Sequence, residues 1–186
     1  MKRLIVVCLL VVTLFGCGKA GSAVEDAMGL RDRLLKSNGS SFDAVITADY
    51  GEDIYTFGMK CNTDKDGQLT FTVIEPETIS GISGVISESS ASFTFDEQAL
   101  LFELLADGQV SPISAPWFFV QTLRGGYIRA CTVKHDGLHM IIDDTYEDNA
   151  LQMDIYTDAQ MVPIRGEILF DGRRILSLDI QKFMFL

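Results

Sequence analysis

The chain has 186 residues and carries 15 lysines and arginines against 26 aspartates and glutamates, which gives a net charge of −11 at pH 7. This acidic balance disfavours binding to nucleic acid, because the phosphates would repel the protein. The length suits a single domain that is large enough to bury a hydrophobic core.

The start of the chain is typical of an export signal. Two basic residues precede an apolar run over residues 4–15, and the small residue Gly16 stands directly before Cys17. The run is shorter than the roughly 20 residues that a membrane-spanning helix needs, which disfavours a plain transmembrane anchor. A cysteine in this place resembles a bacterial lipobox, in which the thiol receives diacylglycerol and becomes the first residue of the mature chain. We therefore predict a signal peptide over residues 1–16 and lipidation of Cys17.

Loss of Lys2 and Arg3 with the signal would leave a mature chain with a net charge of −13. Such a chain gains no attraction from anionic headgroups, so stable anchoring needs more than one acyl chain on Cys17. The sequence therefore predicts a lipid anchor at the outer face of the bacterial cytoplasmic membrane, in the cell envelope. Residues 17–22 would form a tether, and residues 23–186 one domain.

A helix is predicted directly after the tether. Ser22 and Glu25 form a capping box, which marks the start of a helix, and Asn38-Gly39 is a good stop. We expect one side of this helix to be solvated, because it carries most of the charged residues. The apolar residues at helical spacing are Val24, Ala27, Met28, Leu34 and Leu35.

Most of the remaining sequence alternates apolar and polar residues, the period of a half-buried strand. Asp64-Lys65-Asp66-Gly67 separates two such runs and resembles a fragment of a calcium loop, but the later ligands and the closing Glu are missing. An ordinary hairpin turn is therefore favoured there. The predicted strands cover residues 42–50, 55–61, 69–73, 84–87, 91–96, 100–105, 127–133, 138–142, 151–155, 162–170 and 174–185.

A second helix interrupts the strands. Pro112, Pro116 and Gly125-Gly126 bracket residues 114–124, which are apolar around most of the helix and should be largely buried. The fold class that follows is α+β, one large antiparallel sheet with two helices. A sheet of this width can curl around a cavity, and the residues proposed to line it are Trp117, Phe118, Phe119 and Val120. The alternative is that these four side chains simply fill the core.

Two cysteines remain in the domain, Cys61 and Cys131, and both lie in predicted strands. An exported pair can form a disulfide, whereas a free buried thiol behaves as a small hydrophobic group. The sequence leaves both alternatives open, because it does not tell whether the two Cα atoms come within bonding range.

Groups that could carry chemistry are sparse. His135 and His139 flank a hairpin turn, and a metal-assisted hydrolase would need a third ligand and a base beside them. The acidic cluster over residues 143–148 has no glycine to close a cage around a cation, so solvated turn carboxylates are favoured over calcium. Neither a serine-centred elbow nor a phosphate loop is present in the sequence. We predict no catalytic residue, no metal and no cofactor, and hence no enzyme.

The order of these parts resembles the LolA/LolB-like lipoprotein group. The resemblance spans the lipobox, the first helix, the strands that end in Phe71 to Gly81, the proline-bracketed helix, and the closing strands from Tyr156 through Pro163 to Phe183. It implies an open, incomplete β-barrel with helices over its concave side. Proteins of this group carry or sense acyl chains or lipoproteins, and those of the germination lipoprotein GerS type instead bind cell-wall amidases.

Two functions follow from these observations. The first is a membrane-anchored, non-enzymatic binding protein for an apolar ligand or an acylated client, held in the curved sheet. The second is an adaptor that holds an envelope or cell-wall enzyme through a sheet edge or face. The expected partners are the membrane through acylated Cys17, a lipid or lipoprotein ligand, and an envelope protein; nucleic acid is not among them.

Overall fold

The computed structural model describes residues 18–49, 54–88, 90–95, 98–102, 105–106, 109–134, 136–147 and 150–186. The predicted export signal and Cys17 lie outside the described residues. The elements are α2 (Gly18–Lys36), β1 (Gly39–Asp49), β2 (Ile54–Asp64), β3 (Leu69–Glu75), η2 (Glu77–Ile79), β4 (Ser83–Ser87), β5 (Ser90–Phe95), β6 (Gln98–Phe102), β7 (Leu105–Ala106), β8 (Gln109–Val110), η3 (Pro112–Ser114), α3 (Ala115–Gly125), β9 (Tyr127–Lys134), β10 (Gly137–Asp143), β11 (Gln152–Thr157), β12 (Pro163–Phe170) and β13 (Arg173–Phe185).

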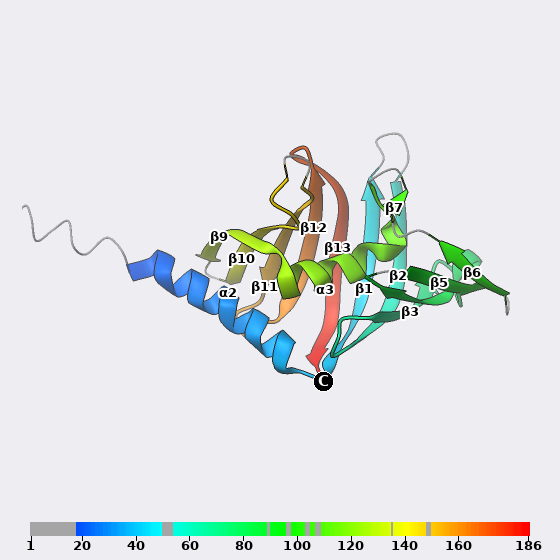
Figure 1. Cartoon of the computed structure of the whole chain (residues 1–186), viewed down its shortest axis with the longest axis horizontal. Coiled ribbons are helices and arrows are strands. Elements are labelled where there is room, and N and C mark those ends of the chain that lie inside the picture. The colour runs from blue at the N-terminus through cyan, green and yellow to red at the C-terminus, as the bar shows by residue number, and fades with distance from the viewer. Residues whose placement is uncertain are drawn as a thin grey trace, which may run out of the picture.

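One large antiparallel sheet dominates the part of the chain that the structure describes. Its eleven strands run in the order β6-β5-β4-β3-β2-β1-β13-β12-β11-β10-β9, so β6 and β9 are two separate edges and the sheet is open. The first and last strands of the chain meet at the centre, where Ala44 pairs with Ile180 and Ile46 with Leu178. The predicted α+β fold, an incomplete barrel with an N-terminal helix and a second helix, is confirmed (Figure 1). The short β7–β8 ladder was not predicted as a separate sheet.

The alternating sequence pattern sorts the side chains of the sheet between two faces. We call the face covered by α2 and α3 the inner face and the opposite one the outer face. On β1, alternate residues from Phe42 to Ala48 are buried on the inner face, as predicted, whereas Asp43 and Thr47 are only half-buried. Strands β2 and β3 alternate in the same way from Met59 and from Leu69 onward. Burial of this apolar face is the main source of stability for the fold.

The turn between β2 and β3 is the ordinary hairpin that the sequence predicted. The Oδ1 atom of Asp64 accepts hydrogen bonds from the backbone N–H groups of Asp66 and Gln68, both at 2.9 Å. Gly67 has a φ of 85°, a left-handed conformation that glycine adopts without a steric penalty. The carboxylate that resembled a calcium ligand is therefore used to close the turn.

Helix α2 differs from the prediction at its start and in the face that it buries. The structure describes it from Gly18 onward, where residues 18–22 are already helical, and Ser22 lies inside the helix instead of capping it. Only one stripe is covered by the sheet and α3, and the predicted core residues Val24, Met28 and Leu35 stay half-exposed. The buried stripe consists of Ala23, Ala27, Leu30 and Leu34.

Helix α3 forms at the predicted place and crosses the inner face of the sheet, and α2 meets it near its C-terminal end (Figure 1). Its buried side chains come from most of its circumference, as the sequence indicated. Within the described residues, neither the length nor the apolar character of any helix is sufficient for crossing a membrane.

Candidate functional site

Hydrogen bonds from long polar side chains hold the C-terminal end of α3 in place. Arg31 of α2 donates from Nε to the carbonyl oxygen of Leu123 and from Nη2 to that of Gly126, both at 2.8 Å. Gln121 donates to the carbonyl oxygen of Gly67 in the β2–β3 turn at 2.7 Å. The bonds from Arg31 satisfy carbonyls that a helix end leaves without intrahelical partners. Burial lowers the pKa of the Arg31 guanidinium, and the charge of nearby Cys131 partly opposes this shift.

Three of the four predicted cavity-lining residues are buried among core side chains. Phe118, Phe119 and Val120 are all buried. The Phe119 ring meets the Phe42 ring edge to face, with centroids 6.2 Å apart, and a Cβ placed on Gly166 would lie 2.8 Å from the Phe119 ring. The part of α3 that contains these residues therefore packs directly on the strands. That they line a cavity stays a prediction.

Trp117 differs from its three neighbours. Its side chain is partly buried against the core, and its indole Nε1 is buried without a hydrogen-bond partner among the residues that the structure describes. A buried N–H group without an acceptor costs free energy, and a tryptophan in a core usually finds one. An acceptor atom brought by a ligand would satisfy it. Of the four predicted lining residues, Trp117 is the one with a buried side-chain N–H that has no partner in the described part of the chain.

A groove runs between α2 and the edge strand β9. It has a volume of about 400 Å³. Strand β9 pairs only with β10, so its other backbone edge is left without a neighbouring strand in the described structure. The sequence analysis did not predict this groove. The first helix has two apolar stripes that cannot both face one sheet, and this pattern could have indicated a second apolar surface. Its lining consists of Val24, Met28, Arg31, Gly125, Gly126, Tyr127, Ile128, Arg129, Ala130 and Cys131.

The cysteines do not form the disulfide that the sequence left open. Cys61 lies on β2 and Cys131 on β9, with β1, β13, β12, β11 and β10 between them, and both thiols are free. Neighbouring strands are roughly 4.8 Å apart, so the separation far exceeds the Cα range of a disulfide. Burial raises the pKa of the Cys131 thiol, and the nearby Arg31 partly opposes this shift.

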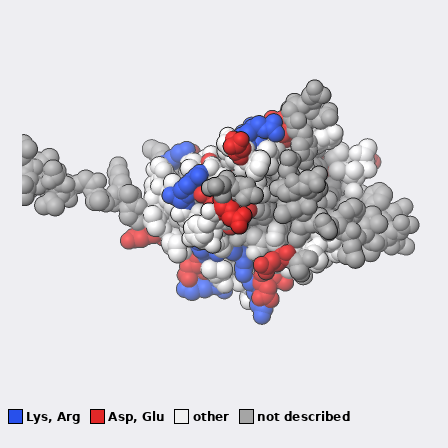
Figure 2. All heavy atoms as spheres, turned by 45° about the horizontal axis from the view of Figure 1, so that its top comes forward, with Lys and Arg blue, Asp and Glu red and all other residues white. Residues whose placement is uncertain are grey.

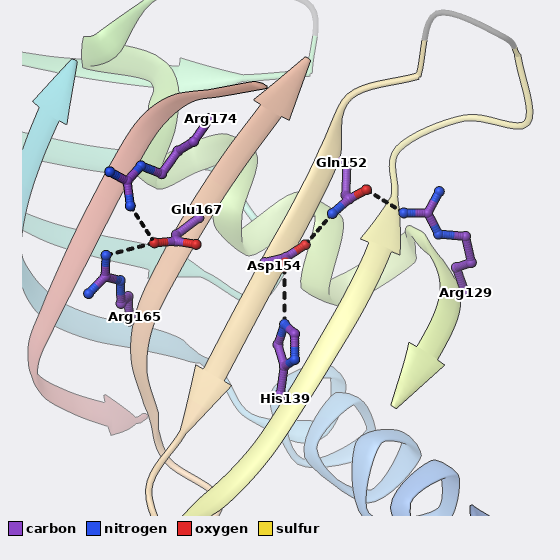
Figure 3. A network of polar contacts seen from close by, with 7 residues as sticks. All are labelled: Arg129, His139, Gln152, Asp154, Arg165, Glu167 and Arg174. Atoms are coloured by element: carbon purple, nitrogen blue, oxygen red, sulfur yellow. Dashed lines mark hydrogen bonds and ion pairs between the residues drawn. The ribbon is translucent and has the colours of Figure 1, made fainter. Parts of the chain in front are cut away.

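The outer face carries a network of polar side chains across strands β9 to β11 (Figure 3). Arg129 donates to Gln152, whose Nε2 donates to Oδ1 of Asp154 at 2.5 Å. The other oxygen of Asp154 lies 3.1 Å from Nε2 of His139. The His139 ring stacks on Tyr156 with centroids 4.4 Å apart. These contacts join neighbouring strands on the face that the helices leave uncovered.

A second part of the network joins β12 to β13. Glu167 accepts hydrogen bonds from Arg165 at 2.6 Å and from Arg174 at 2.9 Å (Figure 3). Burial alone would raise the pKa of Glu167, but the hydrogen bonds from the two arginines outweigh it and hold the pKa below its ordinary value. Burial raises the pKa of the nearby Tyr156, and the negative charges of Glu167 and Asp154 add to this shift.

The predicted chemistry-bearing residues do not assemble into a reactive centre in the described part of the chain. There, His139 makes no hydrogen bond to a hydroxyl or thiol that could act as a nucleophile, and no group of three His, Cys, Asp or Glu residues could hold a metal ion. His135 and Asp148 lie outside the described residues. Asp143 pairs with Arg129 at 3.5 Å, and Asp144 accepts a backbone N–H from Leu151 at 2.8 Å.

Two further cavities lie beside the outer-face network. One of about 410 Å³ is lined by Lys134, His139, Tyr156 and Arg165 among others, and one of about 550 Å³ lies near the β10–β11 connection. On the face drawn in Figure 2, basic side chains lie next to acidic ones, so charges of both signs alternate. The smaller cavity is lined by charges of both signs, and in the larger one Arg129 accompanies three carboxylates and pairs with Asp143.

No protein-family model matches the sequence, and no curated protein sequence matches it either. Several solved structures are similar. An uncharacterised conserved protein from Thermus thermophilus has 15% identity over 86% of this chain and 87% of that chain, with a TM-score of 0.48. A LolA superfamily protein from Nitrosomonas europaea has 10% identity over 91% and 94%, with a TM-score of 0.48. The lipoprotein LppX from Mycobacterium tuberculosis has 12% identity over 87% and 93%, with a TM-score of 0.41.

A LolA superfamily protein is thus among the matches, in agreement with the resemblance drawn from the sequence. All these identities are at or below 15% and the TM-scores are below 0.5.

Proposed function

We propose that this protein is an exported, non-enzymatic lipoprotein that binds an apolar, acylated ligand or client on the inner face of its open sheet. Acyl groups on Cys17 would anchor it at the outer face of the bacterial cytoplasmic membrane. The observation that carries this proposal is Trp117, which packs against the apolar core and whose buried indole N–H has no hydrogen-bond acceptor among the described residues. A ligand with an acyl chain and an ester or amide carbonyl offers both the apolar surface and the acceptor that the site lacks.

The open form of the sheet supports the same proposal. Strands β6 and β9 are not joined, so the inner face is not sealed by a closed barrel. An apolar interior that stays open at an edge admits a chain-like ligand more easily than a closed core does.

The experiment uses the fact that Trp117 is the only tryptophan of the chain. Purified protein is titrated with lysophosphatidylcholine, and tryptophan emission is recorded. We expect the emission to shift as the carbonyl reaches the indole, and we expect Trp117→Phe, which keeps an aromatic ring but lacks the N–H, to bind more weakly in a separate equilibrium assay. Unchanged emission, together with the absence of copurifying lipid in native mass spectra, would refute the ligand site.

The anchor is tested independently of the ligand. In a bacterial host that processes lipoproteins, we expect Cys17→Ala to release the protein from the membrane fraction and to remove the mass of the acyl groups. Continued membrane retention of this variant would contradict the lipobox interpretation.

A second function, an adaptor for an envelope or cell-wall enzyme, is favoured by the unpaired edge of β9. The strand is eight residues long, and most of its side chains are exposed. An extended segment of a partner can add to such an edge through backbone hydrogen bonds. Pull-down from native envelopes would show a stoichiometric protein, and Ala130→Lys, in the groove, should abolish its capture without changing the Trp117 titration.

A further inference from the structure

Helix α2 presents a second apolar stripe that neither the sheet nor α3 covers. Val24 and Met28 are each 50% exposed and Leu35 is 49% exposed. The neighbouring stripe of the same helix, which includes Ala27 and Leu30, is buried against the fold. The helix therefore has an apolar arc wider than its contact with the domain, and the uncovered part calls for another apolar environment.

The position of this stripe relative to the predicted anchor is specific. Val24, Met28 and Leu35 follow each other at intervals of four and seven residues, the spacing of one line along a helix. In the sequence, Cys17 precedes Val24 by seven residues, and it lies outside the described residues. The described residues that follow the predicted anchor position are helical from Gly18 onward. The predicted anchor is therefore next to this helix in the sequence.

We propose that the stripe of Val24, Met28 and Leu35 lies in the surface of the lipid bilayer that holds the acyl chains of Cys17. This inference rests on the proposed function for the acylation of Cys17, and it adds the orientation of the protein on the membrane. The occupant of the stripe is the bilayer surface. A helix of 19 residues, about 28 Å long, would lie along the membrane plane and fix the domain above it.

The charges around the stripe indicate that apolar contact and not electrostatic attraction holds it. Its flank carries Glu25 and Asp32, and the nearby Lys36 is engaged with Asp32 at 2.7 Å. Three half-exposed side chains bind a membrane weakly by themselves, so the stripe would orient a protein that the acyl chains already hold. Zwitterionic and anionic membranes should therefore orient the protein equally well.

One consequence links this orientation to ligand binding. Val24 and Met28 belong both to the stripe and to the lining of the α2–β9 groove. The groove would therefore open at the membrane surface, next to Tyr127 and Ala130 of β9. A lipid or an acylated client that leaves the bilayer would meet the free edge of the sheet first.

The test places a photoreactive side chain on the stripe of the full-length, acylated protein. Met28→p-benzoylphenylalanine and Leu35→p-benzoylphenylalanine are reconstituted in phosphatidylcholine vesicles, with and without phosphatidylglycerol, and irradiated. The matched control is Ile54→p-benzoylphenylalanine, because Ile54 is 66% exposed on β2 and is not part of α2. By mass spectrometry, we expect lipid adducts at positions 28 and 35 in both vesicle types. At position 54 we expect only the background level of adducts.

The other occupants of the stripe are distinguishable outcomes. Three results would overturn the proposed orientation. They are adducts to a second copy of the chain, equal lipid adducts at all three positions, and acylated protein that gives no adducts at positions 28 and 35. The mass of Cys17 is measured in the same samples. Absence of the acyl groups would refute the anchor of the proposed function and this inference with it, whereas acylated protein without the expected adducts refutes the orientation alone.

Discussion

The two faces of the sheet are made by the same strands and differ in what holds them together. On β11, Met153 and Ile155 point to the inner face and are completely buried, whereas Gln152 and Tyr156 belong to the outer face. The inner face is covered by two helices and packs through apolar contact, while the outer face is joined by hydrogen bonds and ion pairs (Figure 3).

This difference indicates where stability and function lie. Buried apolar contacts on the inner face contribute most of the free energy of folding, whereas ion pairs near solvent contribute little each. The proposed apolar ligand would therefore reach the inner face beside Trp117, whose indole N–H has no partner among the described residues, or through the groove at β9. The outer-face network can be altered without affecting that route.

The largest effect is expected from truncation of the inner-face contact between α3 and the sheet. Phe119→Ala should lower the free energy of unfolding by about 3–5 kcal/mol, because Phe119 is 0% exposed and its removal leaves a cavity against Phe42. The matched control is Phe170→Ala at the end of β12, where the side chain is 37% exposed and the change should stay within about 1 kcal/mol. Urea denaturation measures both, and equal losses would show that the buried contact with Phe42 does not determine the cost of the Phe119 substitution.

The next effect concerns the bonds that fasten the end of α3. Arg31→Met keeps most of the apolar stem but removes the donors to the carbonyls of Leu123 and Gly126, which should cost roughly 2–3 kcal/mol of unfolding free energy. Lys36→Met on the same helix removes only an exposed ion pair with Asp32 and should cost less than about 0.5 kcal/mol. A similar midpoint shift for the two variants in thermal melts would show that Arg31 does not hold α3.

The sequence predicted the elements whose pattern is local. The two-residue period from Phe42 to Ala48 predicted β1, because alternate side chains of any half-buried strand must differ in polarity. The prolines and Gly125-Gly126 bracketed α3 because they limit a helix regardless of its surroundings. These features depend on the backbone of a few consecutive residues.

The features that were not predicted depend on which distant residues meet. The sequence of α2 has two apolar stripes, and only the packing of β9 and α3 decides that Leu30 is buried and Leu35 is not. The pair of His139 and Asp154 depends on the register between β10 and β11, which alternation alone does not determine. The α2–β9 groove depends on how α2 packs beside that edge of the sheet and was therefore invisible as a motif.

A smaller effect, with a characteristic pH dependence, is expected on the outer face. Because hydrogen bonds from Arg174 and Arg165 hold the folded pKa of Glu167 below its ordinary value, the carboxylate contributes stability that is complete above the unfolded pKa of about 4.3 and is lost as the pH falls through the folded pKa. Glu167→Gln should cost roughly 1 kcal/mol at pH 7. The difference from the wild type in urea denaturation should shrink below about pH 4, and a difference that grows in acid would contradict this assignment.

The smallest effect is expected on the alkylation rates of Cys61, on the inner face, and Cys131, in the groove. Burial raises the pKa of Cys61, with a further contribution from Asp43, while Cys131 is only half-buried beside Arg31. Alkylation needs an accessible thiolate, so iodoacetamide should modify Cys131 in the native protein, faster as the pH rises, and Cys61 only after unfolding in urea. Peptide mass spectrometry on the Cys17→Ala variant identifies the modified residue. Arg31→Met should slow the reaction of Cys131 at a given pH, because the positive charge that favours its thiolate is gone. Equal native rates for Cys61 and Cys131 would show that the inner face opens as readily as the groove.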